Sequence, residues 1–327
     1  MQKGHIVCFG VESTAHTFGA GIVSDKGTIL SDIRVPYTTT KGGIIPAEAA
    51  KHHDSIYKEA IQKAISESKE KNIDVVAYSA SPGLAPCLRV GLKAAKELAQ
   101  DLKVPLVDVN HVIAHLNSGS LFTETKNPVY VFTSGANTQI ISLEGKRYRI
   151  FGETMDIGIG NALDKFGREI GLGFPSGPRI EELAKAGKYT ELPYTVKGMD
   201  LSFSGILTAA INKFRKGTSK EDLCYSMQET CFSMLTEVSE RALAHLNKNE
   251  ILLIGGVAAN KRLCEMLEKM CKARNARFKA VPLKYAGDNS INIAWQGIIE
   301  YKNGRSIDIK KADIRPYERI DEIEVFW

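Results

Sequence analysis

The chain has 327 residues, of which 43% are hydrophobic and 25% are charged. This length and composition are typical of a globular protein with two domains, and they exclude a largely disordered chain. The formal net charge of +5 permits a polyanionic partner such as nucleic acid without requiring one.

Targeting and cysteine patterns predict a cytoplasmic protein with no membrane partner. No apolar run reaches the roughly 18 residues of a membrane span, and the apolar stretch within residues 1–13 is too short for a signal peptide. The six cysteines form no C-x-x-C pair and no dense framework. Such thiols are typical of a reducing compartment, where we expect them to pack as small hydrophobic side chains.

Residues 5–33 predict three strands. An apolar strand, a small polar turn and a second strand are followed by a D-K-G hairpin and a third strand. The chain then continues into a helix over 47–71, a buried strand and turn over 74–83, and a second helix over 88–102. This alternation is typical of a sheet that gains parallel strands through helical connections.

Residues 128–153 repeat the order of the first three strands, with a turn at Gly145. A long helix over 219–246 follows, then a buried strand that opens into a helix over 251–260, and a further strand over 277–283. The sequence therefore predicts two related α/β halves, each a sheet with helices on both faces.

The run HVIAH (111–115) carries the first candidate for chemistry. Asn110 is suited to cap a helix that begins there, which places His111 and His115 one turn apart on the same face, where they can share a metal ion. The three intervening residues are apolar, so the general base of an H-E-x-x-H zinc protease is missing. From these residues alone, a metal site and two structural histidines are equally favoured, and a third ligand would decide.

Three turns rich in small residues are candidates for holding phosphate: residues 12–21, 133–139 and 255–260. Backbone N–H groups in such turns can bind phosphate oxygens, particularly beside the start of a helix. One such turn is a weak signal, because tight hairpins use the same residues. Three turns in the same order across two duplicated halves are a stronger one.

This arrangement resembles the actin, Hsp70 and sugar-kinase superfamily, and eight motifs narrow the resemblance to one family. The motifs are GVESTAHTFGAGIV, GGIIPAEAAKHH, HVIAH, TSGANTQ, GNALDKFGREIGLGFPSGPRIEELA, DLSFSGI, GGVAAN and GDNSINIAW. Together they resemble the tRNA N6-adenosine threonylcarbamoyltransferase family in its archaeal and eukaryotic form, the catalytic subunit of the KEOPS complex. The resemblance implies a duplicated actin-like ATPase (RNase H-like) fold with the active site in the cleft between two lobes. We expect lobes over residues 1–125 and 126–305, followed by a tail over 306–327.

The resemblance also implies a metal site. Its ligands would be His111, His115 and Asp288, holding one divalent metal per chain, with iron favoured and zinc or magnesium as alternatives. Two imidazoles and one carboxylate suit a divalent transition metal and leave positions open for substrate. The archaeal pattern often has a tyrosine ligand where this chain has Phe132, and Tyr130, on the same strand face, is an alternative fourth ligand. With Asp288 as the third ligand, the hypothesis that HVIAH binds a metal is favoured over two structural histidines.

The resemblance implies an adenine-nucleotide site, for threonylcarbamoyl-AMP or alternatively ATP. Asp164 and Glu181 would bind ribose hydroxyls, Gly177 would permit close approach, and Asn260 would lie on the adenine side. For both carboxylates the alternative is a solvated position on a helix. The phosphate and acyl group would be lined by Phe132, Thr133, Ser134, Gly135 and Ala136.

The implied reaction is attack by N6 of the adenosine 3′ of the anticodon on the carbamoyl carbon, with AMP leaving, in tRNAs that read codons beginning with A. Because AMP is a good leaving group, positioning and charge stabilisation would supply most of the rate. The sequence identifies no covalent nucleophile and no general base. The implied partners are tRNA, a small atypical protein kinase and small accessory subunits of the KEOPS complex.

Three other functions remain alternatives. An ATP-dependent small-molecule kinase could use the same fold and the same turns. A metallopeptidase is suggested by H-x-x-x-H but lacks the base. A non-enzymatic scaffold could bind nucleotide and partner proteins.

Overall fold

The computed structural model describes residues 5–38, 44–70 and 72–327. Gly42 and Gly43 of the GGIIPAEAAKHH motif, and Lys71 at the end of the expected first helix, lie outside the described residues. The chain divides into two compact units. Unit 1 comprises Met1–Leu121, Gly145–Arg147 and Gly287–Trp327, and unit 2 comprises Phe122–Glu144 and Tyr148–Ala286.

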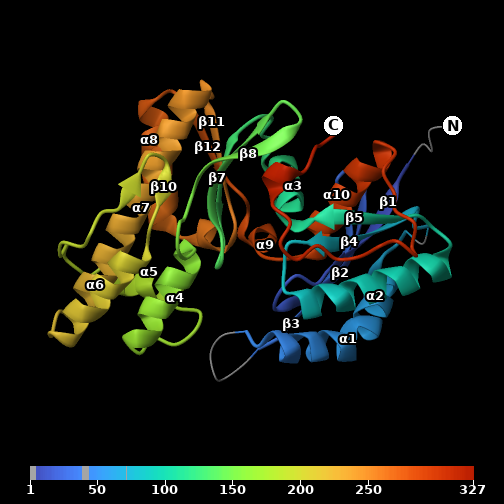
Figure 1. The fold of residues 1–327 in the computed structure, drawn as a ribbon, viewed down its shortest axis with the longest axis horizontal. Coiled ribbons are helices and arrows are strands. Elements are labelled where there is room, and N and C mark those ends of the chain that lie inside the picture. Colours follow the sequence, from blue (N-terminus) through green and yellow to red (C-terminus); the bar gives the residue numbers. More distant parts are fainter. Residues whose placement is uncertain (1–4, 39–43, 71) are drawn as a thin grey trace. The chain divides into compact units, whose positions relative to one another are not determined.

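Unit 1 is built on a five-stranded sheet with the order β3-β2-β1-β4-β5. Strand β1 is antiparallel to β2 and parallel to β4, and Figure 1 shows α1 and α2 on one side of the sheet and α10 on the other. The elements are β1 (Val7–Glu12), β2 (Thr17–Ser24), β3 (Ile29–Pro36), α1 (Pro46–Glu67), β4 (Val75–Ser81), α2 (Ala85–Leu102), β5 (Leu106–Asn110), α3 (His111–Thr123), α10 (Ser290–Lys302) and the short 3-10 helix η2 (Ile320–Glu322).

Alternate residues of β1 face opposite helical layers. Val7, Phe9 and Val11 belong to the core shared with α1 and α2. Gly10 faces α10, where a Cβ would overlap the carbonyl oxygen of Ser290 and lie 2.6 Å from the backbone nitrogen of Ala294. The missing side chain therefore lets the first turn of α10 lie directly on the sheet. This close packing fixes the position of the residues just before α10.

Unit 2 contains a second five-stranded sheet, with the order β12-β11-β6-β7-β8. Read from its other edge, this order matches that of unit 1 strand for strand, so the predicted duplication is confirmed. The elements are β6 (Val129–Thr133), β7 (Thr138–Glu144), β8 (Arg147–Glu153), α4 (Ile159–Glu169), α5 (Gly177–Ala184), β9 (Val196–Lys197), β10 (Asp200–Leu201), α6 (Ser204–Arg215), α7 (Lys220–Leu246), β11 (Glu250–Ile254), the 3-10 helix η1 (Gly256–Ala259), α8 (Lys261–Ala273), β12 (Arg277–Ala280) and α9 (Leu283–Ala286).

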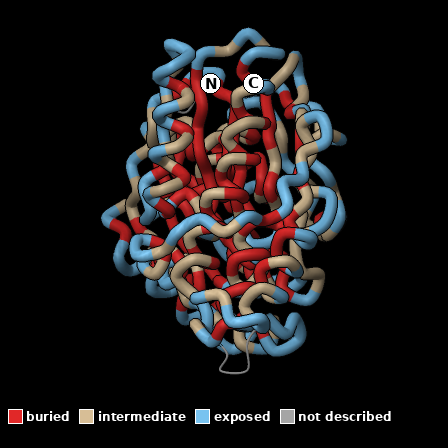
Figure 2. Tube along the Cα trace, turned by 90° about the vertical axis from the view of Figure 1, so that its left-hand side faces the viewer, coloured by how far each residue is buried: buried red, intermediate tan, exposed pale blue. Residues whose placement is uncertain are grey.

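Burial follows the strands in both units. Every residue of the strands β1, β2, β4, β6 and β11 is buried, whereas β3, β8 and β12, at sheet edges, are only partly buried. Figure 2 shows the buried residues in red, and the helices alternate between buried and exposed positions. The long helix α7 supplies much of the unit 2 core, including Phe232 and Leu235. No helix in the described ranges combines the length and apolar character needed to cross a bilayer.

The unit boundaries and the last expected strand differ from the sequence expectations. Residues 287–305 were expected in the second lobe, but they belong to unit 1 because α10 packs on β1, β2 and β4. The strand expected over 277–283 ends at Ala280, close to Pro282, which lacks the N–H that a ladder requires.

Candidate metal centre and nucleotide turns

The helix that carries both histidines begins where it was predicted to begin. Asn110, the last residue of β5, accepts hydrogen bonds on Oδ1 from the N–H groups of Val112 at 3.0 Å and Ile113 at 3.1 Å. This side chain thereby satisfies two N–H groups that have no partner within the helix. His111 and His115 follow on one face of α3, with ring centroids 4.5 Å apart.

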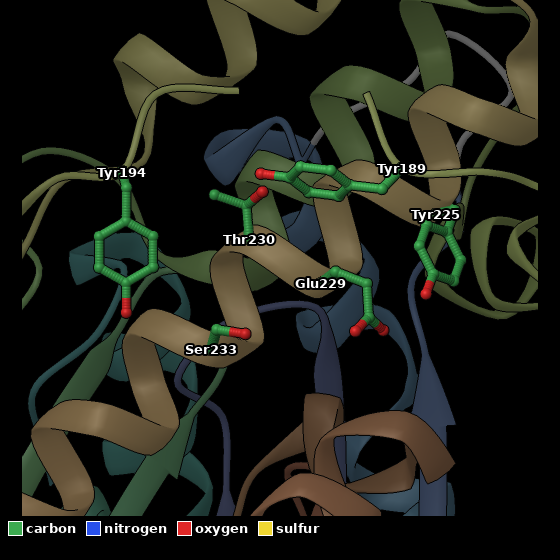
Figure 3. Close-up of a pocket in the computed structure, with 6 residues that line it drawn as sticks. All are labelled: Tyr189, Tyr194, Tyr225, Glu229, Thr230 and Ser233. Atoms are coloured by element: carbon green, nitrogen blue, oxygen red, sulfur yellow. The ribbon is translucent and has the colours of Figure 1, made fainter. Parts of the chain in front are cut away.

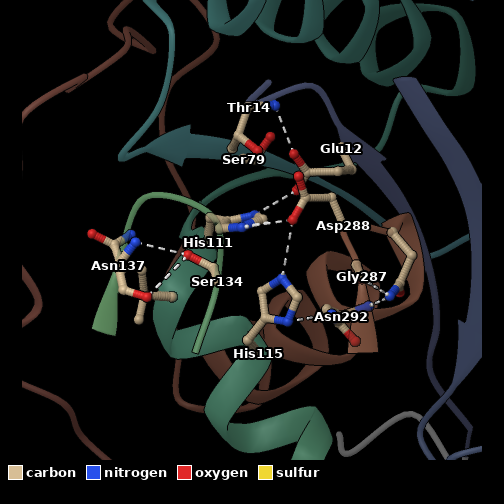
Figure 4. A network of polar contacts seen from close by, with 12 residues as sticks. Glu12, Thr14, Ser79, His111, His115, Ser134, Asn137, Gly287, Asp288 and Asn292 are labelled. Atoms are coloured by element: carbon tan, nitrogen blue, oxygen red, sulfur yellow. Dashed lines mark hydrogen bonds and ion pairs between the residues drawn. The ribbon is translucent and has the colours of Figure 1, made fainter. Parts of the chain in front are cut away.

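Asp288 meets both histidines. Its Oδ1 lies 3.4 Å from Nε2 of His111 and 3.6 Å from Nε2 of His115 (Figure 4). One ligand atom from each of the three residues lies within 4.8 Å of the other two. Two imidazole nitrogens and one carboxylate oxygen form the donor set typical of a divalent transition metal with open positions. The three residues named from the sequence therefore converge within unit 1 and fit a metal ion.

A fourth residue of this cluster, Glu12, was not identified from the sequence. It ends β1 with its side chain fully buried, accepts a hydrogen bond from the N–H of Thr14 at 2.6 Å, and lies 2.8 Å from Nδ1 of His111. A carboxylate accepts the proton of Nδ1, which leaves the lone pair of Nε2 for a metal. The available signal was a lone carboxylate at the end of an otherwise apolar strand.

Asn292, in the first turn of α10, lies next to Nδ1 of His115, as Glu12 lies next to Nδ1 of His111. Its amide nitrogen lies 3.1 Å from Nδ1 of His115, and its Oδ1 has no hydrogen-bond partner among the residues that the structure describes. Because the oxygen and NH₂ ends of an amide are nearly the same in size and shape, the amide can be turned to direct Oδ1 at Nδ1. In that orientation it accepts the Nδ1 proton and leaves Nε2 of His115 as the ligand atom.

The electrostatics of the cluster favour positive charge. Burial lowers the pKa of His111, but the carboxylates of Glu12 and Asp288 outweigh burial and raise that pKa to about 10. Burial and the neighbouring His111 lower the pKa of His115. Burial also raises the pKa of Asp288, yet hydrogen bonds from the two histidines hold it well below its usual value. Two carboxylates around two imidazoles thus provide a setting that suits a bound cation.

Replacing Glu12 by glutamine is expected to weaken metal binding about 10- to 100-fold, which is the usual effect of losing a group that hydrogen-bonds a metal ligand and orients it. The glutamine oxygen must face the N–H of Thr14, so its NH₂ group faces Nδ1 of His111 and the proton moves to Nε2. The test is competition with a chelator, using purified wild type and variant. An unchanged dissociation constant would show that Glu12 does not set the tautomer of His111.

The candidate phosphate turn over residues 133–139 follows β6 in unit 2. Phe132 and Thr133 are buried, and the hydroxyl of Thr133 donates to the carbonyl of Ile254 at 3.0 Å. The turn closes when the N–H of Asn137 donates to Oγ of Ser134 at 2.9 Å. Gly135 and Ala136 lie exposed at its tip. Only Ser134, Gly135 and Ala136 of the five predicted residues are therefore open to solvent.

The residue proposed as a substitute ligand lies on the same strand. Tyr130 is buried and its ring packs edge-on against Tyr148, with centroids 6.0 Å apart. This packing accounts for the position of Tyr130 within unit 2. Its role as a fourth ligand stays a prediction.

The start of α4 lies on this turn. The N–H of Asn161 donates to the carbonyl of Gly135 at 3.0 Å, and that of Gly160 to the carbonyl of Ser134 at 3.3 Å. A Cβ on Gly158 would overlap the carbonyl oxygen of Gly135. The glycines of the G-I-G-N sequence thus let the helix approach the turn closely and fix its shape.

The remaining four predicted residues also lie in unit 2. Asp164 accepts a hydrogen bond from the N–H of Ser176 at 2.8 Å. Ser176 precedes Gly177, the first residue of α5. Burial raises the pKa of Asp164, and the hydrogen bond from Ser176 partly offsets that rise. One turn along α5, Glu181 accepts from the N–H of Lys261 at 2.9 Å.

Asn260, directly before Lys261, caps α8 by accepting from the N–H of Leu263 at 3.1 Å. Its amide nitrogen donates to Gln228 at 2.7 Å. The structure therefore brings Glu181 and Asn260 to the same place, where α5 meets the start of α8. Neither Asp164 nor Glu181 is simply a solvated carboxylate, because each accepts a backbone hydrogen bond.

A cavity of about 340 Å³ lies elsewhere in unit 2. Figure 3 shows it between α7 and the segment before β9. Its lining residues are Tyr189, Tyr194, Tyr225, Glu229, Thr230 and Ser233. They include none of the nine residues predicted to bind nucleotide, so this cavity is not the predicted nucleotide site.

Comparison with known sequences gives one consistent result. Residues 28–295 match the family described as TsaD: tRNA N6-adenosine threonylcarbamoyltransferase. A tRNA N6-adenosine threonylcarbamoyltransferase of Archaeoglobus fulgidus is 50% identical over 323 residues, which cover 98% of this chain and 100% of that protein. A probable bifunctional tRNA threonylcarbamoyladenosine biosynthesis protein of Methanocaldococcus jannaschii is 48% identical over 98% of this chain. The chain spans 60% of that longer relative.

Solved structures that resemble the chain carry the actin-like ATPase fold. HypF of T. kodakarensis superposes with a TM-score of 0.58 at 15% sequence identity, over 90% of this chain and 47% of that one. A component of (R)-2-hydroxyglutaryl-CoA dehydratase from Acidaminococcus fermentans gives a TM-score of 0.54 at 14% identity, over 90% and 97%. At these identities the likeness concerns the fold alone, and it confirms the fold class predicted from the sequence.

Proposed function

The chain belongs to the tRNA N6-adenosine threonylcarbamoyltransferase family, and we propose that it transfers the threonylcarbamoyl group from threonylcarbamoyl-AMP to N6 of the tRNA adenosine 3′ of the anticodon. The family resemblance seen in the sequence and the assignment to the transferases are thereby confirmed. The observation that carries the proposal is the convergence of His111, His115 and Asp288 in a chain about half identical to transferases over its whole length.

The proposal assigns a divalent metal, iron, to the cluster in unit 1. His111, His115 and Asp288 would hold it, with Glu12 and Asn292 orienting the two imidazoles. Two histidines with one carboxylate are the donor set that supports iron over magnesium, which prefers oxygen ligands. When bound, such an ion polarises a carbonyl group or orients the substrate that carries it.

The proposal assigns the adenylate to unit 2. The exposed backbone of Gly135 and Ala136 would face the phosphate and acyl group, since a turn held by the start of α4 presents fixed dipoles. Glu181 and Asn260 would lie on the ribose and adenine side, with Asp164 near Gly177. In the transfer, N6 of the adenosine attacks the carbamoyl carbon, the bond to the AMP phosphate oxygen breaks, and N6 loses a proton.

The proposed partners are tRNA, a small atypical protein kinase and the small accessory subunits of the KEOPS complex. The family resemblance supports this set, and so does the word bifunctional in the name of the longer relative from Methanocaldococcus jannaschii. The formal charge of +5 suits a polyanionic substrate. The proposed compartment is the cytoplasm, which agrees with the six free cysteines.

Transfer of labelled threonylcarbamoyl from its adenylate to unmodified tRNA tests the proposal. We expect label on tRNA from the chain with its partner subunits, loss of label after metal removal by a chelator, and recovery when iron is returned. The competing kinase is not favoured by the family match. Phosphorylation of small sugars or acids that survives metal removal from the cluster, without any label on tRNA, would establish the kinase instead.

A further inference from the structure

A segment near the C-terminus is bound beside the strand ends of unit 1. The N–H of Arg315 donates to the carbonyl of Ala80 at 2.8 Å, and the N–H of Gly83 donates to the carbonyl of Pro316 at 3.1 Å. The hydroxyl of the buried Tyr78 donates to the carbonyl of Asp313 at 2.9 Å. These bonds hold residues 313–318 along the end of β4, next to β5 and the start of the histidine helix.

The side chains of this segment form a chain of polar contacts. Arg315 lies 2.8 Å from Asp108 of β5, and its Nε donates to Oε1 of Glu318 at 2.6 Å. The other oxygen of Glu318 accepts from the hydroxyl of Ser81, at the end of β4. Glu318 is thus fixed from both sides, with each carboxylate oxygen accepting from a different donor.

The contacts continue to the helix that carries His111. Oγ of Ser81 accepts from Nδ2 of Asn110 at 3.2 Å, and Oδ1 of Asn110 caps the first turn of α3. A hydroxyl has one proton to donate. Since Glu318 accepts that proton, Ser81 can only accept from Asn110, and this directs the carbonyl end of the Asn110 amide at the helix.

We infer that Glu318 is a positioning residue for the metal cluster. Because the carboxylate of Glu318 can only accept, Ser81 must donate to it and must accept from the NH₂ group of Asn110. The oxygen of Asn110 therefore faces the helix and caps the start of α3, which begins at His111. The inference rests on the proposed metal site and extends it, because it makes the position of a ligand depend on the C-terminal segment. Glu318 itself contacts neither histidine and has no part in the chemistry.

The replacement Glu318→Gln tests this directionality with almost no change in shape. Nε of Arg315 must keep an acceptor, so the glutamine oxygen faces Arg315 and the NH₂ group faces Ser81. Ser81 then accepts from glutamine and donates towards Asn110. This turns the Asn110 amide and directs its NH₂ group at the N–H groups of Val112 and Ile113, which removes the cap. The matched control is Glu324→Gln, the same change at an exposed position six residues further along the chain.

Three readouts separate positioning from general destabilisation. In the metal-free full chain, Glu318→Gln is expected to raise amide exchange at Val112 and Ile113 roughly tenfold. The dissociation constant for Co²⁺, used as the probe metal, is expected to rise about five- to tenfold, with a changed visible spectrum of the Co²⁺ complex. The control variant is expected to match wild type in all three.

A second variant distinguishes loss of the helix cap from a general loss of stability in Glu318→Gln. In the double variant Glu318→Gln, Ser81→Ala no hydroxyl remains to turn the Asn110 amide, so Co²⁺ affinity should recover partly towards wild type. Unchanged exchange, affinity and spectrum in Glu318→Gln, or a double variant worse than the single one, would overturn the role of Glu318. A wild-type chain that binds no Co²⁺ would overturn the proposed metal site as well.

Discussion

Asp288→Asn is expected to lower metal affinity by more than about 100-fold, and transfer to tRNA is expected to fall in parallel. The loss should exceed the roughly 10- to 100-fold effect of removing a group that only orients a ligand, because Oδ1 of Asp288 is an anionic atom that faces the Nε2 atoms of both histidines. An amide keeps the size of the side chain but supplies no charge to bind a cation.

Thermal unfolding with and without metal provides a readout that does not depend on catalysis. A ligand that binds only the folded chain raises the melting temperature in proportion to the logarithm of its concentration over its dissociation constant. Iron should therefore stabilise wild type and leave Asp288→Asn unchanged. Asp101→Asn, at an exposed position of α2, is the matched control and should respond like wild type. Metal stabilisation that persists in Asp288→Asn would show that Asp288 is not a ligand.

Local patterns were sufficient to predict most of the fold. Strands β1 to β3 and β6 to β8 follow from apolar runs broken by turns, and the i, i+4 spacing after a capping asparagine predicted the helix that begins at His111. These features depend on residues close together in the sequence. The repeated strand order in the two units then followed from the repeated pattern.

The residues around the histidines could not be predicted in this way, because they come from distant segments. Glu12 lies 99 positions before His111, and Asn292 lies 177 positions after His115. Asp288 was identified only through the family resemblance. What joins these segments is the packing of α10 on Gly10, a tertiary contact that has no local signature. The same packing explains why residues 287–305 lie in unit 1.

Gly255→Ala is the change expected to damage the candidate nucleotide turns most. Gly255 follows β11 with φ +98° and ψ 174°, a backbone region that is essentially reserved for glycine and costs other residues about 1–3 kcal/mol. A Cβ would also overlap the carbonyl oxygen of Thr133 and lie 2.7 Å from its carbonyl carbon. The strand end that carries Ser134 must then move away from β11.

We expect this variant to lose about 2–4 kcal/mol in the free energy of unfolding, because the crowding adds to the backbone cost. For a chain of this size the melting temperature should fall by roughly 5–10 °C. The neighbouring Gly256→Ala is the control for stability, since a Cβ there meets nothing within 4 Å and should change stability by no more than about 0.5 kcal/mol.

Binding of AMP to the folded variant, measured by calorimetry below its melting temperature, separates stability from function. If the turn after Thr133 holds the phosphate, its displacement should weaken AMP binding at least about tenfold, which corresponds to roughly 1.4 kcal/mol. Unfolding at the wild-type temperature would mean that the strand ends absorb the added methyl group. A lower melting temperature with unchanged AMP affinity would instead place the phosphate away from Ser134, Gly135 and Ala136, because a turn can tolerate displacement only where it makes no contact with the ligand.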